Sequence, residues 1–147
     1  MTTLVEMISA PQRRDAIIAD CVRRAEAQVA SAGGIRGLSL KAGLRALKAV
    51  RPDALTRATG QLLPKFAAAL EPLHREFLAS GEKNFAGFLE KRRAQARDAI
   101  LAVTDARADA GTHRVLIATY RRLRPALASE IEKLLPELIG GIGRQLR

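Results

Sequence analysis

Apolar side chains recur at intervals of three and four residues through most of this chain. Between residues 11 and 31, for example, Ile18, Cys21, Val22 and Val29 follow this spacing, and arginines occupy the remaining arc. This pattern is typical of an amphipathic helix, and the alternation that marks a half-buried strand does not occur. Prolines and glycines separate the periodic segments, as they do in helical proteins. The sequence therefore predicts an all-α fold.

Composition indicates what kind of core these helices can build. A chain of 147 residues is long enough for one domain that buries roughly 68–70 % of the surface of its unfolded form. Aromatic residues make up only 3 % of the chain and tryptophan is absent. The core must therefore consist of alanine, leucine, isoleucine and valine, which suit close-packed helices. We expect residues 1–147 to form one single-domain helical bundle of about six to seven helices.

Prolines and glycines decide the expected helix boundaries. Pro64 and Pro125 are expected to begin new helices, and Pro72 to kink or break the helix that contains it. Gly140, Gly141 and Gly143 predict a fraying end. The helices are predicted over residues 11–31, 39–50, 53–62, 64–80, 85–104 and 112–123 and from residue 125 onward, with residues 105–111 as a loop and Asp53, Asn84 and Thr112 as caps.

Two stretches of the chain repeat a similar order of residues, "RPDALTRATGQLLPKF" and "RPALASEIEKLLPEL". Residues 36–70 and 109–142 both read as a basic helix, a proline, an amphipathic helix and Leu-Leu-Pro. Either an internal duplication into two related halves or chance recurrence of leucine and proline explains this. In both cases Leu62 and Leu134 are predicted to be core, since each follows another leucine by seven residues.

Basic residues concentrate in the same two stretches. The formal net charge is +10 and the sequence pI about 11.0. Residues 27–52 contain five cations and no acid, and residues 112–129 contain four cations and no acid. On helical wheels most of these cations gather on one side. A pI above about 9 is typical of nucleic-acid-binding domains, although no zinc-finger spacing or aromatic base-stacking pattern accompanies it.

The favoured hypothesis is a non-catalytic module whose two basic stripes bind an anionic partner, with nucleic acid as the leading candidate and an acidic protein as another. The candidate contact residues are Lys41, Arg45, Lys48, Arg51, Arg114, Arg121 and Arg124, with Arg36 as a further phosphate contact. The ordinary alternative is a solvated charged surface that binds nothing.

Three other functions remain open. A bundle loosened by Pro64, Pro72, Pro136 and many alanines could enclose an apolar ligand such as a lipid. The segment "LSLKAGLRALKAV" could lie on an anionic membrane surface, although its leucines are expected to face the core and it lacks tryptophan and phenylalanine. An enzyme is the least favoured, because no titratable residues stand in a recognisable catalytic spacing.

Individual reactive residues have structural explanations. Glu71 and His74 have the i, i+3 spacing of a di-iron helix, but the second copy that such a site needs is missing. We therefore expect no metal and no cofactor, and His74 is interpreted as a surface or boundary residue. Cys21 and the four phenylalanines are expected in the core, and Tyr120 with a half-buried hydroxyl.

Targeting signals are not expected from this sequence. The first residues lack the order of a secretory signal, and no stretch approaches the roughly 20 apolar residues of a membrane-spanning helix. With a single cysteine no intrachain disulfide can form, which suits a reducing compartment. We therefore expect a cytoplasmic protein.

The order of several motifs resembles a family of small, all-helical bacterial proteins that carry only a domain-of-unknown-function label. The motifs are "TTLVE", "GGIRGLSLKAGLRALKAVRP", "LLPKFAAALEPL", "ILAVTDARA" and "YRRLRPALASEIEKLLPEL". The resemblance covers nearly the full length, in order. It implies one all-α domain and carries no activity, cofactor or catalytic residue.

Overall fold

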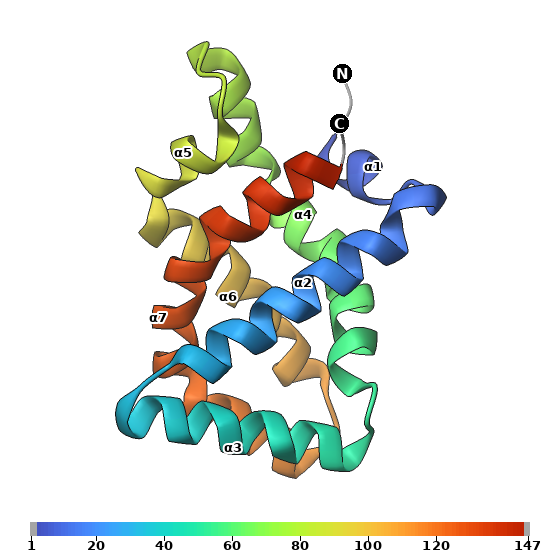
Figure 1. Ribbon diagram of the computed structural model, residues 1–147, viewed down its shortest axis with the longest axis vertical. Coiled ribbons are helices and arrows are strands. Elements are labelled where there is room, and N and C mark those ends of the chain that lie inside the picture. Colours follow the sequence, from blue (N-terminus) through green and yellow to red (C-terminus); the bar gives the residue numbers. More distant parts are fainter. Residues whose placement is uncertain (1–2, 146–147) are drawn as a thin grey trace.

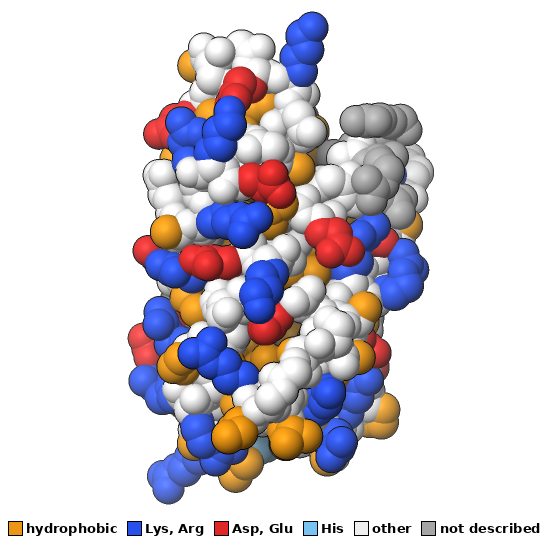
Figure 2. Space-filling view, turned by 60° about the vertical axis from the view of Figure 1, so that its left-hand side comes forward, with side chains coloured by type: hydrophobic (Ala, Val, Ile, Leu, Met, Phe, Trp, Pro, Cys, Tyr) orange, Lys and Arg blue, Asp and Glu red, His pale blue; other side chains and the backbone are white. Residues whose placement is uncertain are grey.

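The computed structural model describes residues 3–145 and contains seven helices and no strand within that range. The helices are α1 (Leu4–Ile8), α2 (Pro11–Ser31), α3 (Gly34–Val50), α4 (Ala54–Ser80), α5 (Phe85–Glu90), α6 (Arg93–Ala110) and α7 (Arg114–Gln145). The long axis of the molecule is vertical in Figures 1 and 2, and Figure 1 shows α2 crossing diagonally while α3 lies across the lower end. The all-α prediction is confirmed.

The link between α2 and α3 is shorter than expected. Helix α2 has the predicted bounds, but α3 begins at Gly34 and not near residue 39. Gly34 adopts a φ of 70°, which only glycine takes up readily. Gly37 packs so closely that a Cβ there would lie 2.0 Å from the Ala32 carbonyl oxygen. Two glycines thus let the chain reverse direction within two residues.

Prolines bend the two longest helices and do not end them. Pro64 and Pro72 lie inside α4, and Pro125 and Pro136 lie inside α7, so the predicted helix starts at Pro64 and Pro125 are wrong. An interior proline removes one hydrogen bond and bends a helix, but the flanking turns can continue. Figure 1 shows both helices curving along their length.

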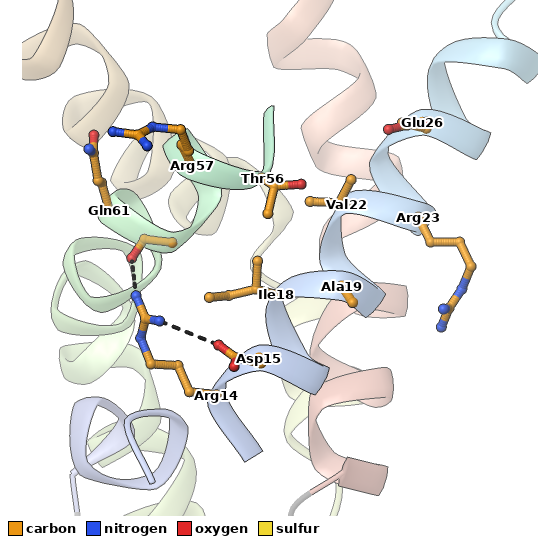
Figure 3. A pocket seen from close by; sticks show the side chains of 11 residues that line it. Arg14, Asp15, Ile18, Ala19, Val22, Arg23, Glu26, Thr56, Arg57 and Gln61 are labelled. Atoms are coloured by element: carbon orange, nitrogen blue, oxygen red, sulfur yellow. Dashed lines mark hydrogen bonds and ion pairs between the residues drawn. The ribbon is translucent and has the colours of Figure 1, made fainter. Parts of the chain in front are cut away.

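Pro64 also supplies a contact between α4 and α2. Because proline has no N–H, the Gly60 carbonyl four residues earlier lacks its helical donor. Arg14 of α2 donates from Nη2 to this oxygen at 3.3 Å, as Figure 3 shows. The second nitrogen of the same guanidinium lies 3.6 Å from Asp15. The acceptor that the proline leaves open is thus used to join two helices.

Other helix boundaries also differ from the predicted ones, because contacts between helices can extend a helix or replace a predicted cap. The helix predicted over 85–104 is divided into α5 and α6, and α6 continues to Ala110, so residues 105–111 are not a loop. Asn84 caps α5 as predicted, accepting from the Gly87 amide at 3.2 Å. Near the start of α7 the His113 Nδ1 accepts from the Leu116 amide at 3.3 Å, so the role predicted for Thr112 falls to His113.

The glycines near the end of α7 belong to the packed part of the molecule. Gly140, Gly141 and Gly143 are helical, so the predicted fraying is wrong. A Cβ at Gly141 would lie 2.8 Å from Asp20 Oδ2 and 2.9 Å from Arg24 Nε. Arg24 Nε donates to the buried Asp20 carboxylate at 2.8 Å, and Arg24 Nη1 donates to Glu137 of α7 at 2.9 Å. Glycine is needed here because α7 approaches an ion pair on α2.

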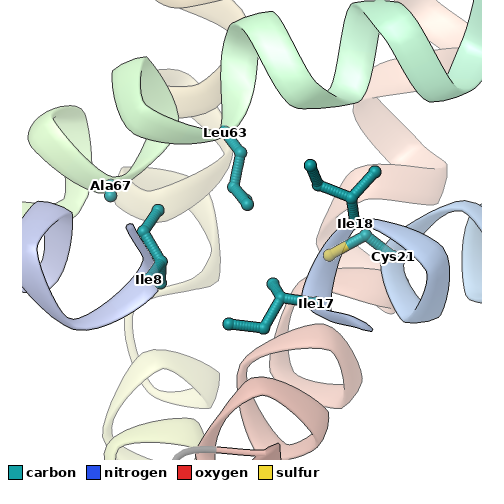
Figure 4. Close-up of a cluster of buried hydrophobic side chains, with 6 residues drawn as sticks. All are labelled: Ile8, Ile17, Ile18, Cys21, Leu63 and Ala67. Atoms are coloured by element: carbon teal, nitrogen blue, oxygen red, sulfur yellow. The ribbon is translucent and has the colours of Figure 1, made fainter. Parts of the chain in front are cut away.

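Two clusters of aliphatic side chains form the core. The first, drawn in Figure 4, joins α1, α2 and α4, and Leu138 and Ile142 of α7 pack against it. It consists of Ile8, Ile17, Ile18, Cys21, Leu63 and Ala67. The second joins α4, α5, α6 and α7 and consists of Leu70, Leu73, Leu89, Ala96, Ile100 and Leu135. Both Leu-Leu pairs of the repeated motif are buried, as predicted.

The two repeated stretches differ in local structure. Pro52 lies in the non-helical link between α3 and α4, whereas the equivalent Pro125 lies inside α7. The first stretch is therefore divided between two helices and most of the second forms one. A common origin of the two halves stays a prediction.

His74 is buried and does not lie at the boundary, so that prediction is wrong. Its ring lies 5.1 Å from the Phe85 ring and 6.0 Å from the Phe77 ring, and Nδ1 has no hydrogen bond among the described residues. It shares a helix face with Leu70 and Phe77, which is why it is carried into the core. Cys21 is buried as expected, and burial, the largest effect, raises the pKa of its thiol to about 11.

Candidate ligand-binding cavity

A large apolar cavity lies behind α3. Its volume is about 1350 Å³, and its walls come from α2, α3, α4, α6 and α7. The large aliphatic residues of the lining are Val29, Leu40, Leu44, Leu47, Val50, Leu55, Leu62, Leu101, Val103, Leu116, Ile117, Leu123, Leu127 and Ile131. Leu40, Leu44 and Leu47 recur at helical spacing, so one face of α3 forms the wall nearest the lower end of the molecule.

Small residues keep this space open. Ala99, Ala102, Ala106 and Ala110 succeed one another at intervals of three and four along α6, and all line the cavity. Each presents only a methyl group where a leucine would fill the space. Ala102 and Ala106 are nevertheless exposed to solvent, as is Val50 on the opposite wall. The cavity therefore opens to the outside.

A close approach of α3 to α7 supports one wall. A Cβ at Gly43 would lie 2.4 Å from Leu123 Cδ1 and 3.7 Å from Thr119 Cγ2. The absence of a side chain at Gly43 thus allows the two helices to pack directly. This contact also brings together the two basic segments, residues 27–52 and 112–129.

Hydrogen bonds between α6 and α7 fix another part of the lining. The Tyr120 hydroxyl donates to Asp105 Oδ1 at 2.6 Å and shares a second hydrogen bond of 2.6 Å with the Thr104 hydroxyl. Both Tyr120 and Thr104 line the cavity. Tyr120 is half-buried, as predicted from the sequence. Because its hydroxyl is already bonded, this wall offers a ligand mainly ring carbons.

Cations are the only charged residues in the lining. They are Arg51, Arg57, Lys65 and Arg107, and His113 also lines the cavity. Arg51 Nε is paired with Asp53 Oδ1 at 2.6 Å. Lys65 and Arg107 form no ion pair among residues 3–145. The cavity thus combines an apolar interior with positive charge that the protein itself does not neutralise.

A second, smaller cavity of about 650 Å³ lies between α2 and α4 (Figure 3). Its lining mixes arginines with Asp15 and Glu26. Arg14 is already bonded to Gly60 and paired with Asp15. Opposite charges and existing bonds leave this groove without one clear ligand chemistry, so the larger cavity is the better candidate.

Half of the cations predicted as contact residues are paired with acids from outside their own stretches. On α3, Lys48 lies 3.4 Å from Glu26 of α2, and Arg51 pairs with Asp53. On α7, Arg121 lies 2.8 Å from Asp109 and Arg124 2.8 Å from Asp105, both on α6. Residues 27–52 and 112–129 contain no acid themselves, but the fold places acids from α2, α6 and the α3–α4 link beside their cations.

The other predicted contacts lie at the surface of the lower end. Arg36, Arg45 and Arg114 are exposed, and Lys41 is half-buried. None of these four forms an ion pair within the described part of the chain. The predicted set is therefore divided into paired cations beside α2, α4 and α6 and unpaired cations on the outside of α3 and the start of α7.

Sequence reasoning left an apolar ligand site open but missed its place in the fold and the acidic partners of the cations. Pro64, Pro72 and Pro136, which were expected to loosen the bundle, do not line the cavity. Asp105 and Asp109 stand four residues apart, which would have placed them on one helix face had their segment not been taken for a loop. The alanine spacing along α6 was visible too. Whether these alanines line a cavity depends on which helices pack opposite α6, and the sequence of one helix does not determine this.

One known protein family matches nearly the whole chain. The model of a family described as a family of unknown function (DUF6918) matches residues 4–146. The chain belongs to this family. Membership in DUF6918 confirms the resemblance noted from the motifs, and the matched range includes the whole cavity. No curated protein and no solved structure matches the chain. Among the described residues, no helix has both the length and the apolar character required to cross a bilayer.

Proposed function

We propose that this protein binds an anionic amphiphile, a molecule with a long apolar chain and an acidic head group, without catalysing a reaction. The observation that carries the proposal is the cavity of about 1350 Å³, whose lining is aliphatic except for a few polar groups and uncompensated cations. The proposal joins two expectations from the sequence, an apolar ligand and an anionic partner. We place this activity in the cytoplasm, which suits a chain with one cysteine.

The size and lining of the cavity favour an extended apolar ligand. Ligand pockets commonly measure about 300–1,000 Å³ and are mostly apolar with a few polar groups. Protein interiors are otherwise packed to a density of about 0.75. Apolar surface left in water costs roughly 25 cal/mol per Å². An acyl chain in this space would remove that cost, because its methylene groups would contact the leucines of α3 and the alanines of α6.

Lys65 and Arg107 would bind the acidic head group. Both line the cavity and neither has a carboxylate partner among the described residues. A hydrogen bond to a charged group contributes about 1.5–3 kcal/mol, so a carboxylate or phosphate should bind at least tenfold more tightly than a neutral alcohol of the same chain length.

Nucleic acid is the second candidate, supported by the unpaired Arg36, Lys41, Arg45 and Arg114. The cavity is favoured over it because Lys48, Arg51, Arg121 and Arg124 would each have to exchange a carboxylate for a phosphate. Binding to labelled duplex DNA over a salt series would test this candidate. A log–log slope of about −0.9 for each phosphate contact, summing to several contacts, would support it.

The first test is organic extraction of gently purified protein followed by mass spectrometry. We expect a co-purified long-chain acid or phospholipid. A fluorescent long-chain carboxylate then measures binding to a separate sample of folded protein from which bound lipid has been removed without organic solvent. Ala102→Phe should reduce its affinity at least tenfold by filling the cavity, whereas Ala68→Phe, at an exposed site on α4 outside the lining, should not. Equal affinities of the two variants would refute the proposal.

A second pair of variants tests the head-group contact. Arg107→Gln combined with Lys65→Gln should weaken binding of the carboxylate about tenfold or more and leave binding of the matching alcohol nearly unchanged. Exchanging the exposed Lys83 and Arg93 for glutamine removes the same charge outside the cavity and should affect neither ligand. Equal losses for carboxylate and alcohol would show that the two cations do not bind the head group.

A further inference from the structure

The outer side of α3 and the start of α7 expose large apolar side chains. Ile35 is 84 % exposed, Leu38 69 % and Val115 64 %, which makes them the most exposed large hydrophobic residues of the described chain. The two helices that carry them pack together at the lower end of the molecule. We call this surface the end face and define it by these three residues together with Arg36, Lys41, Arg45 and Arg114.

Helix α3 is apolar on two opposite sides. Leu40, Leu44 and Leu47 face the cavity, while Leu38 lies on the outward side with Ala42, Arg45 and Ala49, all of them exposed. A surface helix of a globular protein normally carries polar residues opposite its buried stripe. The outward side of α3 therefore departs from the pattern of a helix that is simply solvated.

The cations of the end face are available for a partner. Arg45 lies seven residues after Leu38 and therefore on the same side of α3, while Arg36 and Arg114 are the chain neighbours of Ile35 and Val115. Positive charge is thus carried by the same two helix segments as the exposed apolar groups. None of the four cations has an ion pair within residues 3–145, while the nearby acids Glu26, Asp53, Asp105 and Asp109 are each paired with another cation. The lower tip in Figure 2 accordingly shows hydrophobic and basic side chains with no acidic ones among them.

We propose that the end face docks on an anionic lipid bilayer, with Ile35, Leu38 and Val115 entering the interface and the four cations contacting lipid head groups. Apolar side chains beside lysine and arginine are what an interfacial helix presents to a membrane, and anionic leaflets attract basic segments. The inference goes beyond ligand binding, because no residue of the end face lines the cavity, and Leu38 and Arg45 lie on the side of α3 opposite its cavity-lining leucines.

Other occupants fit this surface less well. A second copy of the chain, docked through its own end face, would bring its four cations against the four cations of the first copy. Like charges oppose such a contact. A nucleic acid would neutralise the cations but leave the three apolar side chains in water. Of these three occupants, an anionic bilayer is the one that satisfies both kinds of group at once.

Flotation with lipid vesicles tests the apolar contact. The folded protein, freed of bound lipid, should float with mixed phosphatidylcholine–phosphatidylglycerol vesicles and not with pure phosphatidylcholine vesicles. Ile35→Ser combined with Leu38→Ser should reduce binding at least tenfold, whereas Leu78→Ser, at an exposed site near the other end of the molecule, should leave it unchanged. Unaltered binding by the double variant, with its helical circular dichroism intact, would overturn the proposal.

The charge contact is tested by a matched pair of triple variants. Arg36→Gln, Lys41→Gln and Arg45→Gln together should weaken vesicle binding about 100-fold, which corresponds to about 1 kcal/mol for each basic residue near an anionic surface. Exchanging Lys83, Arg93 and Lys133 for glutamine removes the same net charge elsewhere and should cost far less. Equal losses for both triple variants would show that only overall charge matters, contrary to the proposal.

Insertion can be observed directly because the chain contains no tryptophan. The tryptophan emission of Leu38→Trp should shift to shorter wavelength when anionic vesicles are added. The emission of Leu78→Trp should not shift. An unshifted Leu38→Trp spectrum on bound protein, or tighter binding to duplex DNA than to the vesicles, would refute docking on a bilayer. Ala102→Phe should still bind vesicles, which separates this inference from the cavity proposal.

Discussion

The carboxylate of Asp105 receives three hydrogen bonds from α7. Arg124 donates from Nε at 2.9 Å and from Nη2 at 2.8 Å, and Tyr120 donates at 2.6 Å. The bonds from Arg124, followed by the bond from Tyr120, lower the pKa of Asp105 from 3.8 to about 2. Burial, followed by the bond to Asp105, raises the pKa of Tyr120. Both residues therefore keep one charge state across the neutral range, and the part of the cavity wall that Tyr120 forms does not titrate there.

The lowered pKa of Asp105 predicts a loss of stability in acid. The folded pKa lies below the unfolded value, so this carboxylate stabilises the native state fully above about pH 4 and loses its contribution as the pH falls through about 2. Asp105→Asn should lower the melting temperature near neutral pH. The difference from the unchanged protein should shrink between about pH 5 and about pH 2. A difference that is constant over this range would show that Asp105 does not titrate as inferred.

Among the elements, the turn between α2 and α3 places the strictest demand on side-chain size. Gly37→Ala should destabilise the protein by about 2 kcal/mol or more, because its Cβ would meet the Ala32 carbonyl at 2.0 Å and backbone would have to move. Gly33→Ala is the matched control, since a Cβ there meets nothing within 4 Å and its φ is −100°. It should be neutral or stabilising by up to about 1 kcal/mol. Urea denaturation of both variants would measure this, and equal effects would contradict the close approach of Gly37 to Ala32.

The bend at Pro64 predicts a coupling between α4 and α2. Arg14→Ala should cost about 0.5–1.5 kcal/mol, since it removes the hydrogen bond to the Gly60 carbonyl. In a Pro64→Ala background the helical N–H can occupy that carbonyl, so the same arginine substitution should cost less. A double-mutant cycle by urea denaturation measures the difference. Additive effects would mean that the bond does not depend on the proline.

At the scale of the whole molecule, the cavity predicts a limit to ligand length. Affinity for saturated carboxylates should rise about fourfold per methylene, as expected from about 0.8 kcal/mol per buried CH₂, and level off once the chain fills the space. Competition with the fluorescent carboxylate gives these affinities. Ala102→Phe should move the plateau to shorter chains. An affinity independent of chain length would argue against enclosure of the apolar part.

The local sequence pattern was sufficient to predict the fold class, the bounds of α2 and the burial of both Leu-Leu pairs, because these depend on periodicity within one helix. It was insufficient at Pro64 and Pro125, where packing keeps the helix continuous. The candidate site was predicted only in outline. Positive charge and apolar content were evident, but the pairing of Arg121 and Arg124 with α6 depends on contacts between separate helices.

The contact of α7 with α2 has a consequence for synthesis. Ile17 is fully buried in a cluster against which Leu138 and Ile142 pack, so partners of this cluster are more than a hundred residues apart. At about 5–20 residues per second a ribosome needs roughly 6–25 s to add the later residues after Ile17. During that interval part of the apolar face of α2 lacks its covering helix. This cluster is therefore completed only after α7 has been synthesised, and until then α1 and α4 alone can cover it.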